Sequence, residues 1–591
     1  MSRLWIVARR LASGCVALAV VVGVLVACAD GVVPSVQSVS IEGPEARLLM
    51  EGETLQLQVA VDAVGGAPVT VNWTSSDEAV AVVSSSGLIV ALCAGGPVTI
   101  TATSVFDASA QDAVTVEVTP LPLVSGATGG TYLDLTNARA GRPDATGPGT
   151  RAVGFDLGWS ESWRGPAGPT YVDAADNWDA VWLFAKFRVG DGAWRHARLA
   201  ATGHGIPVGA VLDVTTDGTG AFVYRAAPGY GRFDVEGLSL VWDYAADGVA
   251  YDDPLEFRLF GIEMVFVPQG GFALGSGGSG TGEFRAGGTP NVPFVVSSQS
   301  SISLGNSAGQ LTWSQSTWTG EPMGSTNASF PTGFAAFYVM KHEVTQGQYV
   351  AFLNTLVQAQ ADVRKHTGST YRYTITGSSV GSYAASLPYV GMNHVSWADG
   401  AAFVDWAALR PLTELEFEKA ARGTATAVPN EYAWGSTSIT QAMGLANAAT
   451  MAETPTPANA NANFYEWETG IPVDGPVRVG AFAMPGDSRR DAGAGYYGAL
   501  ELSGNLWESA VTLGNAEGRA FAGTHGDGVL DAGGNANVPS WPGSSAVGTG
   551  ARGGSFGVPF VNLPVSDRTL STEGIASRSV SRGWRGARTA P

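Results

Sequence analysis

Hydrophobic and polar residues alternate along residues 36–119, and this period of two restricts that part of the chain to β-structure. The alternating runs are SVSIEG, TLQLQVAVDA, VTVNWTSS, VTITATS and AVTVEVTP, and Gly, Pro, Asp and Ser fill the turns between them. Because successive side chains of a strand point to opposite faces, each run can bury one face and expose the other. The segment therefore predicts an antiparallel β-sandwich of short strands.

The composition of the chain limits its number of domains and its partners. Its 591 residues correspond to about three or four domains at roughly 150 residues each. Charged residues make up only 14% of the chain, and the formal net charge is −19. Binding to nucleic acid requires a basic surface, and no basic run occurs after residue 10. We therefore expect no nucleic-acid partner.

The N-terminus predicts export and lipid attachment. Three arginines in MSRLWIVARR precede the apolar run LASGCVALAVVVGVLVA, which is followed by Cys28. The sequence LVAC resembles a bacterial lipobox, in which the bond before the cysteine is cleaved and the thiol is acylated. We expect a signal peptide at 1–27, lipid on Cys28, a membrane tether at 28–35, and a location in the bacterial cell envelope, at the outer membrane or cell surface. A plain secretory signal and an uncleaved anchor are the alternatives, but the apolar run is short for a membrane span.

Cysteine usage leaves one thiol in the mature chain. Cys15 would leave with the signal peptide and Cys28 would carry lipid, so that only Cys93 remains. A single thiol cannot form an internal disulfide, and core packing must therefore hold this exported chain together. Cys93 lies in the apolar strand pattern GLIVALCAGG, which favours a buried structural thiol over a reactive one.

A second β-rich segment spans residues 129–258, after a linker at 120–128 that is rich in Pro, Gly and Ser. Tryptophans are concentrated in this segment, and exposed aromatic stripes can bind sugars, so a carbohydrate-binding module is one interpretation. The alternation in AVWLFAKFRV instead places every second side chain on one face, as in a core strand: Val181, Leu183, Ala185 and Phe187. We therefore favour a β-sandwich whose aromatic residues form the core.

Residues 259–591 combine helix starts with long irregular stretches. Thr345, Ser396 and Thr413 each precede an apolar run, and each has Gln, Asp or Glu three residues later. This arrangement is typical of helix N-termini, because the two side chains satisfy backbone amides that the first helical turn leaves free. The segment therefore predicts an α+β, loop-rich domain.

Residues 36–119 resemble the bacterial Ig-like group 2 domain. In this resemblance Trp73 fills the core, Ser75-Ser76-Asp77 forms a turn, and Gly87 and Gly95-Gly96 permit tight reversals. Such domains serve as stalks or as adhesive modules on cell surfaces. We expect a stalk.

Residues 259–591 resemble the formylglycine-generating enzymes, also called sulfatase-modifying factor domains. The matching phrases are MVFVPQGGFALGSG, FYVMKHEVTQGQYVAFLN, NHVSWADGAAFVDWAALRPLTELEFEKAARG, YAWG, GALELSGNLWE, ARGGSF and GWRGART. The resemblance implies a relative of the C-type lectin fold. The expected fold is therefore multidomain, with two all-β sandwich modules followed by an α+β, loop-rich C-type-lectin-like domain.

The residues that follow ARGGSF indicate that copper chemistry is absent. Formylglycine-generating members bind copper(I) through two cysteines shortly after this motif, and copper(I) requires such soft ligands. Here Val558 stands where the first cysteine is expected, and residues 94–591 contain no cysteine. We expect no copper and no oxidase activity, with Arg552 paired to an internal carboxylate and the following stretch lining the groove that binds substrate in the enzymes.

Other enzymatic chemistries have weaker signals. An iron-dependent branch of the superfamily uses histidine ligands, but His342, His366, His394 and His525 lack the spacing of a facial triad. Four carboxylates close in sequence could act as acid or base, and we assign them instead to helix capping or solvation: Asp399, Asp405, Glu414 and Glu416.

The resemblance also implies structural calcium. One site would use the carboxylates of Glu501 and Glu508 with the carbonyls of Gly504 and Leu506, which is a hard-oxygen set suited to Ca²⁺. A second site would use the side chain of Asn463, the carbonyl of Phe464 and the carboxylate of Asp474, although the spacing between Asn463 and Asp474 is shorter than usual.

These observations lead to one expected function and three alternatives. We expect a lipid-anchored surface protein whose catalytically inert C-terminal domain recognises a protein, peptide or glycan. The first alternative is a superfamily enzyme, with sulfatase-modifying-factor-like or iron-dependent chemistry, acting on an exported protein or small molecule. The second is a structural subunit of a surface complex, which would show a large apolar patch in place of a groove. The third is a ligand-variable domain, with variation among sister genes confined to about residues 550–588.

Overall fold

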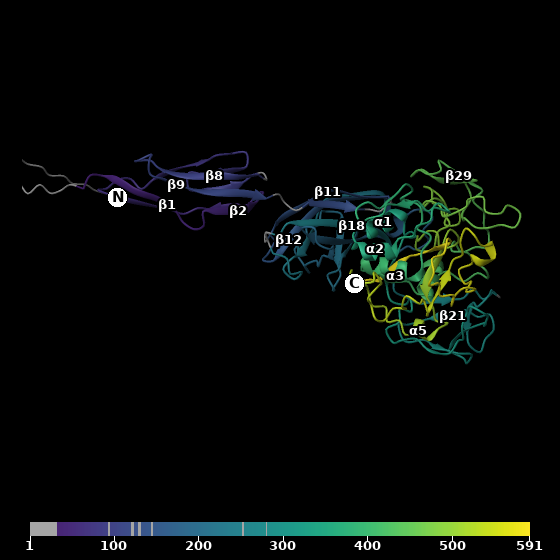
Figure 1. Ribbon diagram of the computed structural model, residues 1–591. Coiled ribbons are helices and arrows are strands. Elements are labelled where there is room, and N and C mark those ends of the chain that lie inside the picture. Colours follow the sequence, from purple (N-terminus) through teal and green to yellow (C-terminus); the bar gives the residue numbers. More distant parts are fainter. Residues whose placement is uncertain are drawn as a thin grey trace, which may run out of the picture. The chain divides into compact units, whose positions relative to one another are not determined.

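Figure 1 shows a computed structural model of the chain, which divides into two compact units, Met1–Pro120 and Leu121–Pro591. The structure describes residues 32–92, 95–119, 123–127, 132–143, 146–250, 253–278 and 280–591. The predicted signal peptide, the predicted lipid site Cys28 and the predicted buried thiol Cys93 lie outside these ranges. Within them, no helix is long and apolar enough to cross a membrane.

The first unit consists of short strands around a single core. Its strands are β1 Ser35–Ile41, β2 Ala46–Met50, β3 Thr54–Gln56, β4 Val59–Val64, β5 Val71–Ser75, β6 Ala81–Val83, β7 Leu88–Ala91, β8 Gly95–Ser104 and β9 Gln111–Thr119. Every second residue of β9 from Val114 to Val118 is buried, as the period of two predicts. Trp73 packs against this core but is only partly buried. β2 and β9 run parallel, a pairing that alternation cannot predict because it carries no information on strand direction.

A nine-stranded sheet lies at the centre of the second unit. Its main path is β15-β16-β13-β18-β25-β34-β28, with β10 paired to β18 and β14 paired to β13. These strands are β10 Leu123–Ala127, β13 Asp179–Val189, β14 Arg195–His196, β15 Ala210–Val214, β16 Ala221–Arg225, β18 Leu255–Val267, β25 Phe337–Met340, β28 Arg410–Pro411 and β34 Gly586–Thr589.

Strand β18 continues across the domain boundary that the sequence suggested. We expected one module to end at residue 258 and the next to begin at 259, but both positions lie inside β18. β18 pairs with β13 from the middle segment and with β25 from the C-terminal segment. The two segments therefore share one sheet and belong to one compact unit. The sequence does not show which strands pair, and it therefore could not show that these two segments form one sheet.

Strand β13 is buried on both of its faces. The predicted core face, with Val181, Leu183, Ala185 and Phe187, packs in one hydrophobic cluster. A three-stranded sheet contributes to the same cluster, formed by β11 Leu133–Pro143, β12 Thr150–Arg164 and β17 Gly229–Asp243. The opposite face, with Ala180, Trp182 and Phe184, packs in a second cluster that includes residues of the C-terminal segment. The predicted core role of these residues is confirmed, and the second buried face explains why the middle segment does not separate.

The three helix starts predicted from capping residues are confirmed. Thr345, Ser396 and Thr413 each form a capping box at the start of a helix. The helices of the described residues are α1 Gln346–Leu353, α2 Gln358–Arg364, α3 Trp397–Trp406, α4 Glu414–Arg422 and α5 Ala516–Arg519, with 3-10 turns η1 Gly165–Ala167 and η2 Phe560–Asn562.

Short strands connected by irregular backbone complete the unit. They are β19 Phe272–Leu274, β20 Phe284–Ala286, β21 Phe294–Val296, β22 Ser303–Leu304, β23 Leu311–Trp313, β24 Gly324–Ser325, β26 Ile375–Thr376, β27 Ala384–Ala385, β29 Gly444–Ala446, β30 Thr454–Thr456, β31 Trp507–Val511, β32 Thr549–Arg552 and β33 Arg582–Gly583. The chain as described is multidomain and rich in strands, with few helices.

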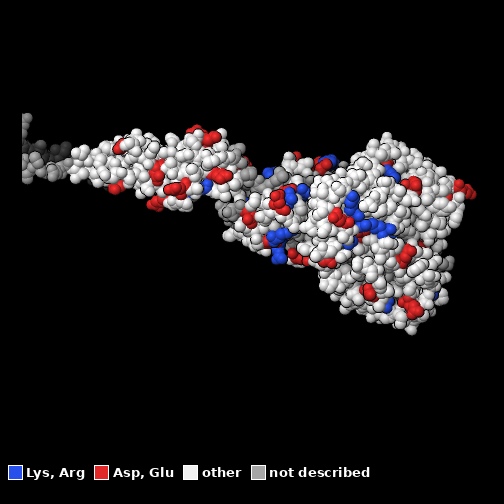
Figure 2. Space-filling view, in the orientation of Figure 1, with Lys and Arg blue, Asp and Glu red and all other residues white. Residues whose placement is uncertain are grey.

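Charged side chains are sparse on the face shown in Figure 2, where small acidic and basic groups are separated by uncharged surface. Many charged residues of the second unit are instead buried. A buried charge is costly unless it is paired, so we expect these residues to have partners of opposite charge or hydrogen-bond partners.

Candidate functional site

The site begins at the turn formed by Arg552-Gly553-Gly554-Ser555-Phe556. Gly553 and Gly554 have φ angles of 86° and 76°, in the region that favours glycine. A Cβ on Gly553 would lie 2.8 Å from the carbonyl oxygen of Leu502, and one on Gly554 would lie 2.6 Å from Cδ1 of Leu563. The two glycines therefore allow the end of β32 to turn within the core.

The guanidinium of Arg552 pairs with internal carboxylates, as expected. Its Nη1 lies 3.2 Å from Oε2 of Glu414, and its Nη2 lies 2.6 Å from Oε1 of Glu418. The two glutamates are four residues apart on α4, so one face of the helix presents both of them. We expected Glu414 to cap or solvate the helix, and this is wrong. Its side chain is 1% exposed and forms ion pairs with Arg552 and Arg568. Glu416 does complete the capping box with Thr413.

Arg552 belongs to a larger network of buried charges, which we call the α4 network. Burial opposes ionisation of Glu418, but Arg552 and Arg422 outweigh it and hold the pKa of Glu418 below its usual value. The network balances three carboxylates against three guanidinium groups, each residue at most 2% exposed: Glu414, Glu418, Glu431, Arg422, Arg552 and Arg568. It fastens α4 to β32 and to the segment that follows the RGGSF turn.

A cavity of about 500 Å³ opens where that segment meets the loop before β20, and we call it the C-terminal groove. It is lined by Gly280, Thr281, Glu283, Asn430, Tyr432, Thr437, Phe560, Val561, Asn562, Pro564, Asp567 and Thr569. Arg568 connects the segment after the RGGSF turn to the loop before β20. Its backbone amide donates to the carbonyl of Thr281, and its Nη1 donates to the carbonyl of Gly282 at 2.9 Å. The α4 network therefore supports the groove directly through Arg568.

Two carboxyl groups line the C-terminal groove, and the sequence did not single out either as a functional residue. Burial raises the pKa of Asp567 to about 6, although Thr569 donates hydrogen bonds to it. Burial also raises the pKa of Glu283, whose carboxylate accepts a hydrogen bond from Ser276 at 2.9 Å. The two acids come from segments about 280 residues apart, so only the folded chain shows that they share a cavity.

Val558 lies just after the turn, where the copper-binding enzymes are expected to carry a cysteine. It is partly buried, its amide donates to Ser555, and its carbonyl accepts from Tyr465. The chain contains no cysteine after Cys93. The groove therefore offers carboxylates, amides, hydroxyls and aromatic rings, but no thiolate.

The histidines of the C-terminal segment are distributed over separate environments. His366 and His394 stack on each other with ring centroids 4.2 Å apart, His342 lies near Glu501, and His525 accepts from the amide of Thr589. Across the ranges that the structure describes, no three or more His, Cys, Asp or Glu side chains are grouped so as to hold a metal ion.

The carboxylates assigned to α3 also lie away from the groove lining. Asp399 accepts hydrogen bonds from the amide and the hydroxyl of Ser396, the N-cap residue of α3, and pairs with Arg364 and Arg578. Asp405 accepts hydrogen bonds from the amides of Asp527 and Asn537.

The residues predicted for the first calcium site lie together around the start of β31. The carboxylate of Glu508 is held by Arg585, and that of Glu501 accepts from the amide of Gly480 at 2.7 Å. A third acid, Glu343, joins them, and burial together with Glu508 and Glu501 raises its pKa well above normal. Sequence reasoning missed Glu343, whose carboxyl group accepts hydrogen bonds from the side chain of Asn505 and the amide of Leu506. Calcium at this site stays a prediction.

The residues predicted for the second calcium site are only partly available. Nδ2 of Asn463 donates to the carbonyl of Gly475 at 2.9 Å, which places Asn463 beside the turn containing Asp474. Its buried Oδ1 has no hydrogen-bond partner, so this oxygen is available as a metal ligand. The carbonyl of Phe464, however, accepts from Gln441 at 2.7 Å. Calcium at this second site also stays a prediction.

Comparison with known proteins identifies the family. Residues 261–590, more than half of the chain, match the model of the sulfatase-modifying factor enzyme 1-like domain. The chain belongs to this family. Residues 35–119 match the bacterial Ig-like domain, group 2. The sulfatase-modifying-factor domain thus contains the RGGSF turn, the α4 network and the C-terminal groove, and both resemblances found in the sequence are confirmed.

The remaining similarities are shorter or weaker. A 3-O-alpha-D-galactosyl-alpha-L-arabinofuranosidase from Bifidobacterium longum subsp. longum is 46% identical over 89 residues, which cover 15% of this chain and 8% of that enzyme. Domains 5–6 of the S-layer protein SbsC align at 15% identity over 34% of this chain and 97% of that one, with a TM-score of 0.13. A carbohydrate-binding module of the β-sandwich superfamily aligns at 13% identity over 40% of this chain and 97% of that one, with a TM-score of 0.10.

Proposed function

We propose that this chain is a lipid-anchored protein of the bacterial cell envelope whose sulfatase-modifying-factor domain binds a protein, peptide or glycan without oxidising it. The observation that carries this proposal is Val558 at the position expected for the first copper-binding cysteine, shortly before residues 560–569, which line the C-terminal groove. Copper(I) requires thiolate ligands, which the domain lacks. The Ig-like unit then serves as a stalk.

The lining of the C-terminal groove supports recognition. Asn430, Asn562 and Thr437 offer hydrogen-bond donors and acceptors, and Phe560 and Tyr432 offer aromatic surface. A rigid base carrying irregular loops is the usual arrangement of a binding surface, and the α4 network provides such a base. Val561 stands at the groove with 57% of its surface exposed, where a bound ligand would cover it.

Arrays of glycans and peptides probed with the purified chain test this proposal. We expect binding to at least one array component, and we expect Val561→Asp to weaken it about tenfold or more by placing a charge in the contact. Val547, which is 40% exposed and lies outside the groove lining, gives the matched control Val547→Asp, which should bind normally. Equal loss in both variants, or no effect of Val561→Asp, would contradict recognition through this groove.

An acid–base enzyme is the second candidate, because Asp567 and Glu283 share the groove and both have raised pKa values. A carboxyl group with a pKa near 6 can donate a proton close to neutral pH. Mass spectrometry of the ligand after incubation separates the two functions. A recognition domain returns the ligand unchanged, whereas an enzyme gives product that disappears in Asp567→Asn.

We also propose that the domain holds structural calcium at Glu501, Gly504, Leu506 and Glu508, and at Asn463, Phe464 and Asp474. Three buried carboxyl groups at the first site repel one another, and a bound cation would relieve that repulsion. We expect elemental mass spectrometry to find calcium, and EDTA to lower the melting temperature by removing a ligand that binds only the folded chain. Added calcium should restore the melting temperature. Stoichiometric iron or copper would instead overturn both the calcium proposal and the inert recognition function.

A further inference from the structure

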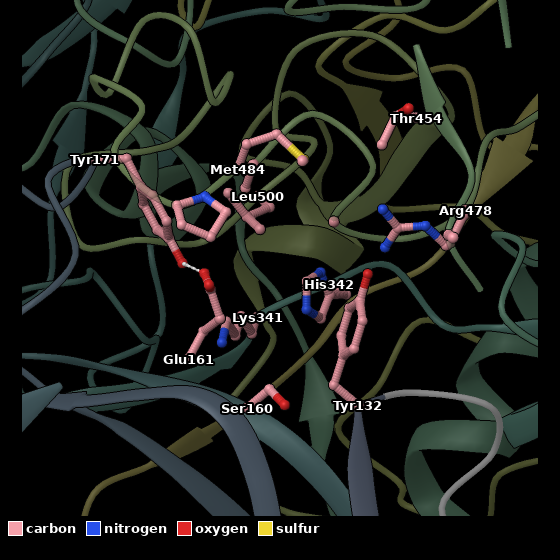
Figure 3. A pocket seen from close by; sticks show the side chains of 14 residues that line it. Tyr132, Ser160, Glu161, Tyr171, Lys341, His342, Thr454, Arg478, Met484 and Leu500 are labelled. Carbon is pink, nitrogen blue, oxygen red and sulfur yellow. Dashed lines mark hydrogen bonds between the residues drawn. The ribbon is translucent and has the colours of Figure 1, made fainter. Parts of the chain in front are cut away.

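A second cavity, of about 330 Å³, lies between the middle segment and the sulfatase-modifying-factor domain, and we call it the inter-segment cavity. Tyr132, Ser160, Glu161 and Tyr171 come from the middle segment, and Lys341, His342, Arg478 and Met484 come from the family domain. Figure 3 shows Arg478 and His342 on one side of the cavity and Tyr171 and Glu161 on the other. Its lining residues are distinct from those of the C-terminal groove.

Arg478 is the most informative residue of this cavity. It is 3% exposed, yet none of the ion pairs among the described residues includes it. Its Nε and Nη1 donate to the carbonyls of Glu453 and Val479, both at 2.9 Å, and its guanidinium stands 5.3 Å from the ring centroid of Tyr132. The carboxylate of Glu453 cannot serve as its counterion, because it pairs with Arg372. Glu501 acts on the guanidinium electrostatically but forms no ion pair with it. A buried guanidinium that forms no ion pair, in the wall of a cavity, can receive an anionic ligand.

His342 and Lys341 also line the cavity, and Figure 3 shows Lys341 beside Glu161 on the side opposite Arg478. Nδ1 of His342 lies 3.4 Å from Oε2 of Glu501, and its buried Nε2 lies 4.0 Å from Oε2 of Glu263. Lys341 is 3% exposed, and its Nζ lies 3.2 Å from Oε2 of Glu263 and 3.6 Å from Oδ2 of Asp179. Both residues therefore face carboxylates within the protein, which leaves Arg478 to meet a ligand.

The rest of the lining selects among anions. Met484, Leu500, Pro485 and the ring of Tyr171 are apolar, which disfavours a small, strongly hydrated ion such as free phosphate. We propose that the inter-segment cavity binds a small organic carboxylate, with the carboxylate at Arg478 and the body of the molecule against Tyr132 and Tyr171. Glu161, on the side opposite Arg478 in Figure 3, and Ser160 can accept hydrogen bonds from hydroxyl groups of such a ligand.

Thermal melting of the purified chain at constant ionic strength tests this site. Glucuronate and benzoate are the probes, and methyl glucoside and benzyl alcohol are their neutral counterparts. We expect at least one carboxylate to raise the melting temperature saturably below about 50 mM, as a millimolar dissociation constant requires. A larger effect of glucuronate identifies a sugar acid as the ligand class, and a larger effect of benzoate identifies an apolar acid. No shift with either carboxylate, or equal shifts with the neutral compounds, would overturn the proposal.

Variants assign the effect to this cavity. Arg478→Gln should remove the carboxylate shift. Should that buried variant fail to fold, Met484 provides the test, because its side chain lines the cavity but is 43% exposed. Met484→Glu places a competing carboxylate at the cavity and should bind about tenfold more weakly than Met484→Gln, which has nearly the same size but no charge. Unchanged binding in Met484→Glu would place the anion elsewhere.

Discussion

Replacement of Arg552 with methionine should destabilise the sulfatase-modifying-factor domain by about 3–5 kcal/mol, which is the usual cost of breaking a buried ion pair. In the native α4 network three guanidinium groups balance three carboxylates. Without Arg552 the buried region carries an excess negative charge, and Glu418 loses its partner at 2.6 Å. Denaturant unfolding followed by tryptophan fluorescence measures the loss in the second unit, because every tryptophan except Trp5 and Trp73 lies after residue 121.

A double variant distinguishes charge imbalance from simple loss of packing. Glu418→Gln in the Arg552→Met background restores equal numbers of positive and negative groups and keeps a hydrogen-bonding side chain on α4. We therefore expect the double variant to be more stable than the sum of the single effects by about 1 kcal/mol or more. Additive losses would show that the two residues contribute independently and would contradict the description of the α4 network as one charge-balanced group.

The second large effect is expected from Gly400→Ala. An alanine in the interior of a helix is normally about 1 kcal/mol better than glycine. Here the added Cβ would lie 1.9 Å from Cε2 of Trp584, whose indole packs directly against α3 and is 2% exposed. Overpacking of this kind typically costs about 1–3 kcal/mol, and the buried indole has little room to move. We therefore expect a loss of about 3 kcal/mol, measured by the same fluorescence-detected unfolding.

Trp584 provides the control for this prediction. In Trp584→Leu the smaller side chain removes the atoms that the new Cβ would meet. The variant is itself destabilised by the cavity that it leaves, but Gly400→Ala should cost little when added to it. If Gly400→Ala proves equally harmful with and without Trp584, backbone distortion within α3 is responsible, and the contact with the indole is not.

Local features of this fold could be predicted from the sequence, whereas pairing between distant segments could not. The capping boxes at Thr345, Ser396 and Thr413 each depend on residues three positions apart, and all three helices begin where expected. The alternation in β13 correctly identified one buried face. The second buried face of β13 depends on residues more than 150 positions later, such as Tyr338 and Trp406, and no local pattern records them.

The same division applies to the candidate sites. The internal pairing of Arg552 was expected from the sequence and is confirmed, whereas the absence of copper chemistry stays a prediction based on the lack of cysteine after Cys93. Glu283, Glu343 and Arg478 were missed, because each becomes informative only through a neighbour contributed by another part of the chain. An isolated Glu or Arg in a sequence gives no sign of whether its counterion is present. Burial and pairing, which only the folded structure provides, supply that information.

The continuity of β18 has a consequence for how this protein can change over generations. A recombination event that replaced the middle segment would have to supply the first part of β18, and also a strand that pairs with β18 as β13 does. The family domain alone, cut at residue 261, would begin within a strand and lose β13 along one edge. In this chain the middle segment and the sulfatase-modifying-factor domain are therefore structurally interdependent, whereas the Ig-like segment lies in a separate compact unit.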